Sequence, residues 1–516
     1  MADTTALAYL KKILAAPVYD VAKTTDFQHM KLFSAEIGNQ VWLKREDQQP
    51  VKSFKLRGAY NCIANLSEEQ AQRGVIAASA GNHAQGVAYS AAKKQIKATI
   101  VMPDTTPEIK VEAVRSFGKA YVDIVLHGES FDSANKKAFE LANEHGYTMI
   151  PPFDNEHVIA GQGTIGKEIL EQNPNLDVLF IAVGGGGLIA GIAAYVKTIL
   201  PNVTIVAVEA EDSACLHAAK QAGCPVTLPT VGIFADGVAV KRIGDETFKV
   251  AQQFVDDYIT VNSDQICSAI KDTFDDTRVI AEPAGALSVA AMRKYAQQKG
   301  VQGQRFGGIL CGANINFHTL RYVSERCELG EQKEAVFAVT IPEHKGAFQA
   351  FCKVVGNRSI TEFNYRFSSH NQPAHVFVGT KLRDGLPEYQ ALTQSLDDNH
   401  YKWFDLSDNE LAKLHVRYMV GGRPPALLNE HLFSFTFPES PGALLKFLNT
   451  LGEYWNITLF HYRNHGAAQG MVLAGFDIGQ AEIKRFHTFL GMLGYEFEEH
   501  TDNPAYQFFL SDGGGG

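Results

Sequence analysis

Apolar strand-like runs alternate with helix-like segments through about the first 320 residues of the chain. The runs are GVIAAS, KATIVMP, YVDIVLHG, DVLFIAVGGGG, VTIVAVEA and FGGILCGA, and segments such as SANKKAFELANEHG and LIAGIAAYVKTILP separate them. Strands separated by helices of this length form βαβ units, which require a parallel sheet covered by helices on both faces. The first two-thirds of the chain is therefore predicted to be an α/β region with more than one lobe.

The last third of the chain contains an internal repeat. Val336–Arg366 and Leu432–Arg463 each read as a strand, a Pro-Glu-x-x-Gly turn, an amphipathic helix and a second strand. The glycines of the two turns, Gly346 and Gly442, are 96 positions apart (442 minus 346). We therefore expect two small α+β modules, separated by a turn-rich boundary that contains RYMVGGRPPA.

Composition limits the possible settings of the chain. Its 516 residues are 45% hydrophobic and 20% charged, with a formal net charge of -10, which is typical of a globular protein and disfavours broad nucleic-acid binding. Seven cysteines without a C-x-x-C pair fit a reducing cytoplasm, and no window of about 18 apolar residues predicts a membrane span. The N-terminal segment reads as an amphipathic helix and not as a secretory signal. Gly513–Gly516 is expected to lie outside the fold.

The stretch GQGTIGKE, Gly161–Glu168, copies a phosphate-binding P-loop as far as its lysine. A P-loop then requires Ser or Thr to hold magnesium, but Glu168 occupies that position. No long apolar strand precedes the stretch either, so nucleotide binding here is disfavoured.

The stretch VGGGGLIAG, Val183–Gly191, is a better anion site because it follows a strand and opens a helix. The N–H groups of Gly184–Gly187 can surround a phosphate at the positive end of that helix. A dinucleotide site is an alternative, because a G-x-G-x-x-A pattern begins at Gly185 and Glu209 ends the next strand. A tight turn without a ligand is another. Phosphate binding of some kind is favoured.

A second strand-to-helix junction, ASAGNHAQGVA, carries Ser79, Asn82 and His83. These residues either cap the helix or form a pocket rim that binds an anion such as a carboxylate. Lys55, in SFKLRGA, lies at a third junction, where the ordinary interpretation is a solvated lysine. Two anion sites and one special lysine together suggest a phosphorylated cofactor and a carboxylated substrate.

Five motifs in order resemble the serine/threonine dehydratase family of fold type II pyridoxal-phosphate (PLP) enzymes. They are SFKLRGA, SAGNHAQG, VGGGGL, AEPAGA (Ala281–Ala286) and CGAN (Cys311–Asn314). The doubled C-terminal module narrows the resemblance to the biosynthetic threonine deaminases, or threonine ammonia-lyases, which carry paired ACT-like regulatory domains. The resemblance covers nearly the whole chain.

The resemblance implies a role for each site residue. Lys55 becomes the Schiff-base lysine and the catalytic base, Phe54 packs on the cofactor ring, and Asn82 bonds the ring hydroxyl. Ser79, Asn82 and His83 lie in the loop that receives the substrate carboxylate, and Asn155 is a candidate on the substrate side. The cofactor phosphate is held by backbone groups of Gly184, Gly185, Gly186, Gly187 and Leu188.

Three positions depart from related patterns. The family commonly has Ser where Cys311 stands, opposite the pyridine nitrogen; a thiol is a weaker donor but is also neutral, which suits β-elimination over transamination. Serine racemases have Ser at the position of Ala80, which cannot carry a proton, so dehydration is favoured over racemisation. Their cation site is doubtful here because Ser213 and Cys215 follow Glu209, and we expect no metal.

The resemblance also implies the reaction and its control. L-threonine is deaminated to 2-oxobutanoate and ammonia in the committed step of isoleucine biosynthesis, and L-serine is a second substrate. Isoleucine inhibits the enzyme, and valine opposes this inhibition. The alternatives are another PLP-dependent β-elimination on a serine-like amino acid, or a non-catalytic amino-acid sensor. Effectors are expected to bind around the Pro-Glu-x-x-Gly turns, with candidate contacts at Gly442, Leu444, Leu445 and Leu448.

The implied organisation is a homotetramer of chains without nucleic-acid or membrane partners. The expected domains are a catalytic region at 1–325, with a small lobe at about 46–150 inserted in a large lobe, regulatory domains at 333–405 and 428–511, and a tail at 512–516.

Overall fold

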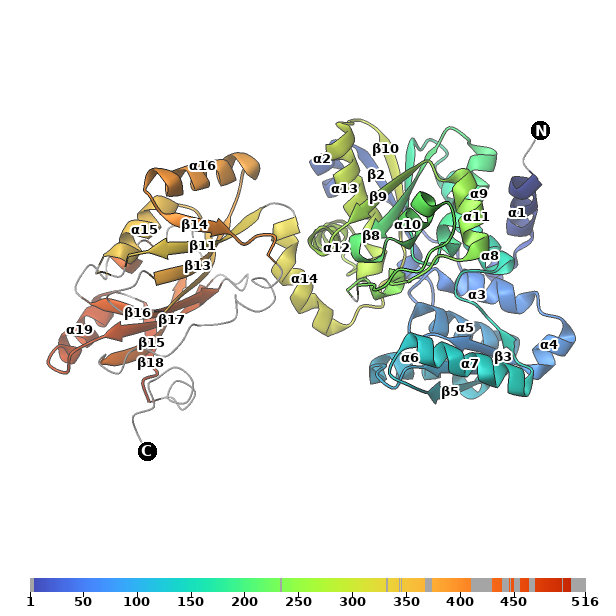
Figure 1. Cartoon of the computed structure of the whole chain (residues 1–516), viewed down its shortest axis with the longest axis horizontal. Helices are drawn as coiled ribbons and strands as arrows, with labels where there is room; N and C mark the ends of the chain where they lie inside the picture. The colour runs from blue at the N-terminus through green and yellow to red at the C-terminus, as the bar shows by residue number, and fades with distance from the viewer. Residues whose placement is uncertain are drawn as a thin grey trace. The chain divides into compact units, whose positions relative to one another are not determined.

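The computed structural model divides the chain into two compact units, Met1–Gly330 and Glu331–Gly516, which we call the N-terminal and C-terminal units (Figure 1). It describes residues 4–232, 234–330, 333–342, 344, 346–366, 374–409, 429–438, 445, 447–449, 455–463, 469–493 and 495–502. No helix among these residues is both long and apolar enough to span a membrane.

The larger lobe of the N-terminal unit is built on a six-stranded sheet with the order β1-β2-β10-β7-β8-β9. Only β1 and β2 pair antiparallel; the other neighbours are parallel. Its strands are β1 (Phe27–His29), β2 (Gln40–Arg45), β7 (Val178–Ala182), β8 (Thr204–Ala210), β9 (Asp257–Val261) and β10 (Arg305–Leu310). The helices of this lobe are α1 (Thr4–Ala15), α2 (Lys31–Ile37), α8 (Glu156–Gln172), α9 (Gly187–Ile199), α10 (Cys215–Ala222), α11 (Asp245–Phe254), α12 (Ser263–Thr277), α13 (Leu287–Lys299) and α14 (Phe317–Gly330).

The smaller lobe has a fully parallel four-stranded sheet with the order β5-β4-β3-β6. Its strands are β3 (Val75–Ala78), β4 (Ala98–Met102), β5 (Val122–Leu126) and β6 (Thr148–Met149). The accompanying helices are α3 (Lys55–Ala64), α4 (Glu68–Arg73), α5 (Asn82–Lys94), α6 (Glu108–Gly118) and α7 (Phe131–His145). Figure 1 shows helices on both sides of the sheets in this unit, as buried parallel strands require.

These strands confirm the predicted α/β class. The six apolar runs of the sequence become β3, β4, β5, β7, β8 and β10, and the N-terminal amphipathic segment becomes α1. The strands β1, β2, β6 and β9 lie outside those runs. Parallel strands end at one edge of a sheet, so the loops after β3, β7 and β10 are available to form a site.

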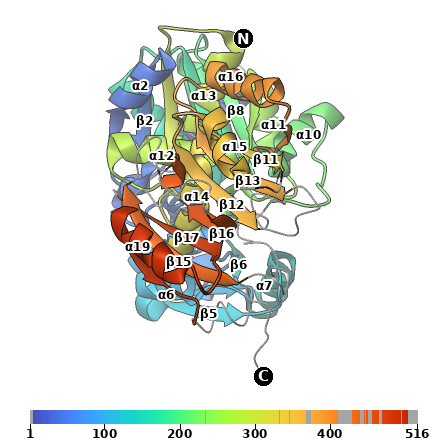
Figure 2. The ribbon, with the colours of Figure 1, turned by 90° about the vertical axis from the view of Figure 1, so that its left-hand side faces the viewer.

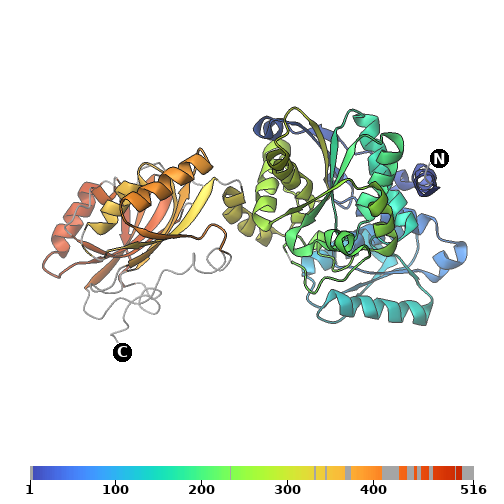
Figure 3. The same ribbon diagram turned by 45° about the horizontal axis from the view of Figure 1, so that its top comes forward.

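The C-terminal unit contains one antiparallel sheet of eight strands, in the order β14-β11-β13-β12-β16-β17-β15-β18. The strands are β11 (Glu334–Ile341), β12 (Ile360–Arg366), β13 (Ala374–Lys381), β14 (Lys402–Asp405), β15 (Glu430–Pro438), β16 (Asn456–Arg463), β17 (Gln469–Asp477) and β18 (Glu496–Glu499). The helices α15 (Ala347–Val355), α16 (Leu386–Asp398) and α19 (Ile483–Leu493) lie along one face of it (Figure 3). The predicted boundary RYMVGGRPPA lies outside the described residues.

The two repeats share this sheet and its core. β12 of the first repeat pairs with β16 of the second, from Glu362 opposite Arg463 to Arg366 opposite Leu459 (Figure 2). Phe348 of α15 packs on Phe363 of β12 and on Phe460 of β16, with ring centroids 4.6 and 5.3 Å apart. The two modules therefore share one sheet and one core and do not form two separate domains.

Candidate active site

The start of α3 is held against the loop that follows β10. The N–H of Phe54 donates to the carbonyl of Cys311 at 3.2 Å, and the N–H of Ala313 donates to the carbonyl of Lys52 at 3.0 Å. These bonds place Lys55, the first residue of α3, at the carboxyl edge of the six-stranded sheet.

The amine of Lys55 lies in a desolvating environment. Its Nζ donates to the carbonyl of Pro152 at 2.9 Å and lies 5.5 Å from the centre of the Phe54 ring. Burial lowers the pKa of Lys55 to about 8, although Cys311 and Glu282 act in the opposite direction. A lysine with such a pKa presents far more neutral amine near pH 7 than an ordinary lysine, and the neutral amine is the nucleophile.

The glycine loop after β7 turns its carbonyls into the protein. The carbonyl of Gly184 accepts from the Cys215 thiol at 3.3 Å, and that of Gly185 accepts from the Thr247 hydroxyl at 2.7 Å. Among the residues that the structure describes, none accepts a hydrogen bond from the N–H groups of Gly184–Leu188. A row of unpaired N–H groups at the start of α9 fits the phosphate of PLP.

Two of these glycines cannot carry a side chain. A Cβ on Gly185 would collide with the ring of Phe153, and Gly186 has a φ of 91°. The segment that carries Phe153 is itself fixed, because Asp154 Oδ1 accepts from the N–H of Thr247 at 3.2 Å. The loop is thereby shaped by its neighbours before any ligand binds.

Asn82, the first residue of α5, belongs to a polar cluster that the sequence patterns did not reveal. Its Nδ2 donates to Glu282 Oε1 at 2.7 Å, and its Oδ1 accepts from Asn314 Nδ2 at 2.7 Å. Glu282 and Asn314 belong to the AEPAGA and CGAN motifs, but their positions in the sequence indicate no role for either side chain. Their partner lies 200 and 232 positions away, so no local pattern connects them.

The other predicted substrate residues also have hydrogen-bond partners within the protein. Ser79 Oγ accepts from the N–H two residues later at 3.3 Å, and Asn155 Oδ1 caps α8 by accepting from two N–H groups at 2.8 and 3.3 Å. His83 Nε2 lies 2.8 Å from the carbonyl of Ile150. Burial, and secondly the charge of Lys55, lower the pKa of His83 to about 3, so its ring is neutral.

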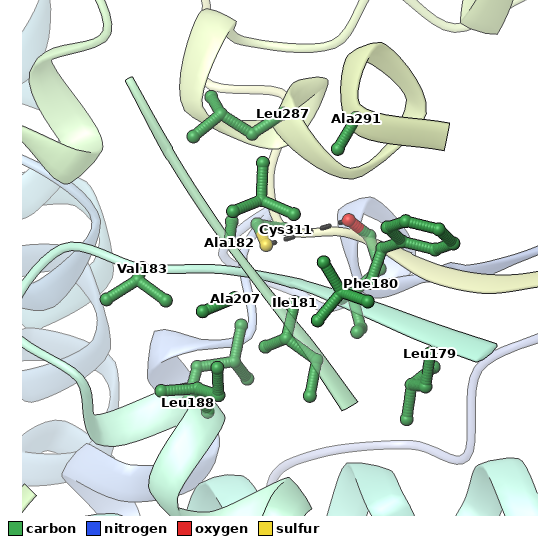
Figure 4. Close-up of a cluster of buried hydrophobic side chains, with 14 of the residues drawn as sticks. Leu179, Phe180, Ile181, Ala182, Val183, Leu188, Ala207, Leu287, Ala291 and Cys311 are labelled. Atoms are coloured by element: carbon green, nitrogen blue, oxygen red, sulfur yellow. Dashed lines mark hydrogen bonds between the residues drawn. The ribbon is translucent and has the colours of Figure 1, made fainter. Parts of the chain in front are cut away.

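Cys311 directly follows β10 and has a buried thiol. Its Sγ donates to the carbonyl of Ile309 at 3.6 Å, and Figure 4 draws it within the same buried cluster as Ala182 and Leu287. Burial raises the pKa of Cys311, with a further contribution from Glu282. The group therefore stays a neutral thiol and is suited to a neutral contact with the pyridine nitrogen.

The P-loop copy is part of a packed helix. Gly161–Glu168 lies entirely within α8, and its glycines let other backbones approach. A Cβ on Gly161 would lie 2.7 Å from the carbonyl of Arg57, and one on Gly163 would lie 2.9 Å from that of Gly191. The spacing thus reflects helix packing, and no phosphate loop exists there.

Glu209, the acidic residue of the dinucleotide alternative, has both oxygens engaged. Oε1 accepts from the N–H of Leu216 at 2.7 Å and Oε2 from that of His217 at 2.8 Å, at the start of α10. Burial raises the pKa of Glu209 to about 7. Glu209 therefore caps a helix, and no group of metal-binding side chains is found among the described residues.

The proposed effector contacts are described only in part. Gly442 and Leu444 lie outside the described residues. Leu445 is partly buried against the core of the C-terminal unit, and Leu448 is a core residue with 2% of its surface exposed. If Leu448 takes part in effector binding, its side chain does so from within the core of the C-terminal unit.

Comparisons with known proteins show the family to which the chain belongs. The family described as "Pyridoxal-phosphate dependent enzyme" matches residues 18–312, and "C-terminal regulatory domain of Threonine dehydratase" matches residues 325–416 and 421–510. The "L-threonine dehydratase biosynthetic IlvA" of Escherichia coli (strain K12) is 58% identical over 98% of this chain and 97% of its own. The mitochondrial threonine dehydratase of Saccharomyces cerevisiae is 48% identical over 97% of this chain and 89% of its own.

Solved structures match part of the chain. The processed form of threonine deaminase isoform 2 from Solanum lycopersicum is 45% identical, with a TM-score of 0.61, over 63% of this chain and 94% of its own. Maize serine racemase is 32% identical, with a TM-score of 0.57, over 61% of this chain and 96% of its own.

The fold and the family match together define a PLP-dependent enzyme of fold type II. The resemblance seen in the motifs is thereby confirmed. The chain belongs to the biosynthetic threonine dehydratase family of PLP-dependent lyases.

Proposed function

We propose that this enzyme deaminates L-threonine to 2-oxobutanoate and ammonia, the committed step of isoleucine biosynthesis in the cytoplasm. The observation that carries the proposal is Lys55, a desolvated amine with a pKa of about 8, at the same edge of the sheet as an unpaired row of backbone N–H groups. Relatives over nearly the full length of the chain are named for threonine dehydration, which supports this substrate.

The residues of the site would divide cofactor binding and proton transfer among them. Bound PLP supplies the electron sink that makes the α-proton of an attached amino acid acidic. Lys55 anchors the cofactor, and its released amine takes the proton from Cα. The N–H groups of Gly184–Leu188 would hold the phosphate, Phe54 would pack on the ring, Asn82 would donate to the ring hydroxyl and the Cys311 thiol would meet the ring nitrogen.

The loop between β3 and α5 is proposed to hold the substrate. The backbone at the start of α5, from Ser79 to His83, binds the carboxylate, and Asn155 borders the pocket. Ala80 has no proton to return to the opposite face of Cα, so loss of the β-hydroxyl proceeds in preference to racemisation. The α-proton and the β-hydroxyl together leave as one water, and one water is consumed when the resulting imine is hydrolysed to 2-oxobutanoate and ammonia.

Product analysis tests the substrate. Purified enzyme with PLP is expected to convert L-threonine into equal amounts of 2-oxobutanoate and ammonia, and L-serine more weakly into pyruvate and ammonia. D-Serine should not accumulate from L-serine. Release of ammonia only from another β-substituted amino acid would favour the alternative elimination, and rapid formation of D-serine would refute the role of Ala80.

The C-terminal unit is proposed to bind the pathway end product. Isoleucine inhibits and valine opposes it, through sites around the Pro-Glu-x-x-Gly turns, in a homotetramer. The shared sheet and the packing of Phe348 on Phe460 support this, because an effector at one repeat can shift the other as part of one body. Such control requires different effector affinities for two conformations.

Removal of the C-terminal unit is expected to remove this control. A fragment of residues 1–330 keeps both sheets of the N-terminal unit and should retain deaminase activity. Its rate should be unchanged by isoleucine, whereas the full chain should lose most of its activity at the same concentration. Retained inhibition of an active fragment would place the effector site in the N-terminal unit.

A further inference from the structure

We infer that Glu282 is a positioning residue, which fixes the amide of Asn82 so that one N–H points to the cofactor. Neither the motifs nor the resemblance gives Glu282 a role. The inference deepens the proposed function and rests on its placement of Asn82 at the ring hydroxyl.

A backbone carbonyl sets the direction of the whole cluster. Asn314 Nδ2 donates to the carbonyl of Val51 at 2.8 Å and to Asn82 Oδ1 at 2.7 Å. Since a carbonyl can only accept, the amide of Asn314 cannot be reversed without losing the bond to Val51. The oxygen of Asn82 must therefore face Asn314, and its nitrogen must face the other way.

Glu282 accepts a hydrogen bond from that nitrogen. Its Oε1 accepts from Asn82 Nδ2 at 2.7 Å, while its Oε2 accepts from the backbone N–H of Asn314 at 3.2 Å. Both oxygens are acceptors, so the ionised carboxylate satisfies the cluster. One of the two N–H bonds of Asn82 Nδ2 is used here, and the second remains for a ligand.

The carboxylate has little freedom to move. Glu282 is 6% exposed, and its N–H donates to the carbonyl of Gly312 at 3.1 Å. A Cβ on Gly312 would collide with Glu282 Oε1, so this loop has to carry glycine for the carboxylate to sit beside Asn82. The cluster is thus built around the position of this one carboxylate.

Charged neighbours set the pH range in which the cluster is intact. Burial, and then the charge of Asp236, raise the pKa of Glu282 to about 7, and Lys110 opposes them. Asp236 and Lys110 pair with each other at 2.8 Å, and the other titratable neighbours are Lys55 and Cys311. As pH falls through about 7, Glu282 gains a proton and loses an acceptor, so activity should fall on the acid side.

Glu282→Gln tests the orientation directly. The side chain of this variant has one acceptor oxygen and one donor NH₂ group in place of two acceptor oxygens. The fixed backbone N–H of Asn314 takes the oxygen. The NH₂ group then opposes Asn82 Nδ2, and the Asn82 amide has to turn. Titration of the apoenzyme with PLP, followed by absorbance, should show that the variant binds PLP at least about tenfold more weakly than the wild type. The matched control is Glu209→Gln, another buried glutamate with two accepted hydrogen bonds, which should bind PLP as the wild type does.

The pH profile is the second readout. In kcat/KM for threonine, the acid limb near pH 7 should disappear in Glu282→Gln, move to lower pH in Asp236→Asn and move to higher pH in Lys110→Met. A Glu282→Gln enzyme with wild-type PLP affinity overturns the inference, and so does one whose acid limb stays near pH 7. Should that variant not fold, opposite shifts in the two surface variants support it, and identical profiles overturn it.

Failure of the inference can be told from failure of the proposed function. The PLP titration requires no turnover. A wild type that releases no 2-oxobutanoate from threonine contradicts the function alone, whereas an unchanged PLP affinity in Glu282→Gln contradicts the inference alone.

Discussion

Lys55→Ala is expected to lower the rate of threonine deamination at least about 10⁴-fold, the upper end of what one positioned acid–base group contributes. The variant loses both the covalent anchor for PLP and the amine that takes the Cα proton. Its bound cofactor should also lose the absorbance of the lysine-bound form. Initial rates of 2-oxobutanoate formation and the visible spectrum of the same sample measure the two losses together.

The control for this variant is Lys93→Ala, which removes an exposed lysine from α5, the helix that begins with Asn82. Its rate and spectrum should match those of the wild type. A small primary amine added to Lys55→Ala should restore part of the rate, because it supplies the missing base. Wild-type activity in Lys55→Ala without added amine would refute the assignment.

Arg57→Met is expected to destabilise the N-terminal unit by about 3–5 kcal/mol. Arg57 is fully buried and pairs with Glu46 at 2.8 Å and with Glu168 at 2.5 Å. Lys44 also pairs with Glu168, at 2.7 Å, so two cations neutralise two anions away from water. Removal of one cation leaves a buried carboxylate without a full partner, which costs more than the pair contributes.

Urea unfolding of the 1–330 fragment measures this effect through Trp42, its single tryptophan. The control is Arg73→Met, because Arg73 pairs with Glu69 on the exposed surface of α4, where such pairs contribute about 0–1 kcal/mol. A midpoint for Arg57→Met as close to the wild type as that of Arg73→Met would show that the buried cluster contributes little.

The class of the fold could be predicted because its signals are local. A single sequence shows apolar runs of strand length and helical segments of the length that βαβ units need. It also shows two similar turns 96 residues apart. The strand β2 gave no such signal. Its Lys44 and Arg45 are charged, and they are buried because Glu168 neutralises Lys44 and Asp47 neutralises Arg45.

Glycine spacing had two different causes in this chain. After β7, Gly184–Leu188 forms an unpaired row of N–H groups at a helix start. In Gly161–Glu168, the same kind of spacing lets α8 pack against its neighbours. The preceding element distinguishes them, because a phosphate loop needs a strand before it.

The site itself was only half predictable from the sequence. Lys55 and Asn82 stand at the starts of helices, where the pattern of residues draws attention to them. Glu282 and Asn314 act through side chains brought together from distant parts of the chain. Only the tertiary structure shows that these partners meet, so spacing could not assign them.

The most direct test of the account is the rate of 2-oxobutanoate formation from a threonine series by the purified full-length chain with PLP, with and without isoleucine. We expect a sigmoidal rate curve that isoleucine moves to higher threonine concentration. The absence of 2-oxobutanoate from a sample that carries bound PLP would contradict the proposed reaction, and a rate that isoleucine leaves unchanged would contradict the proposed control.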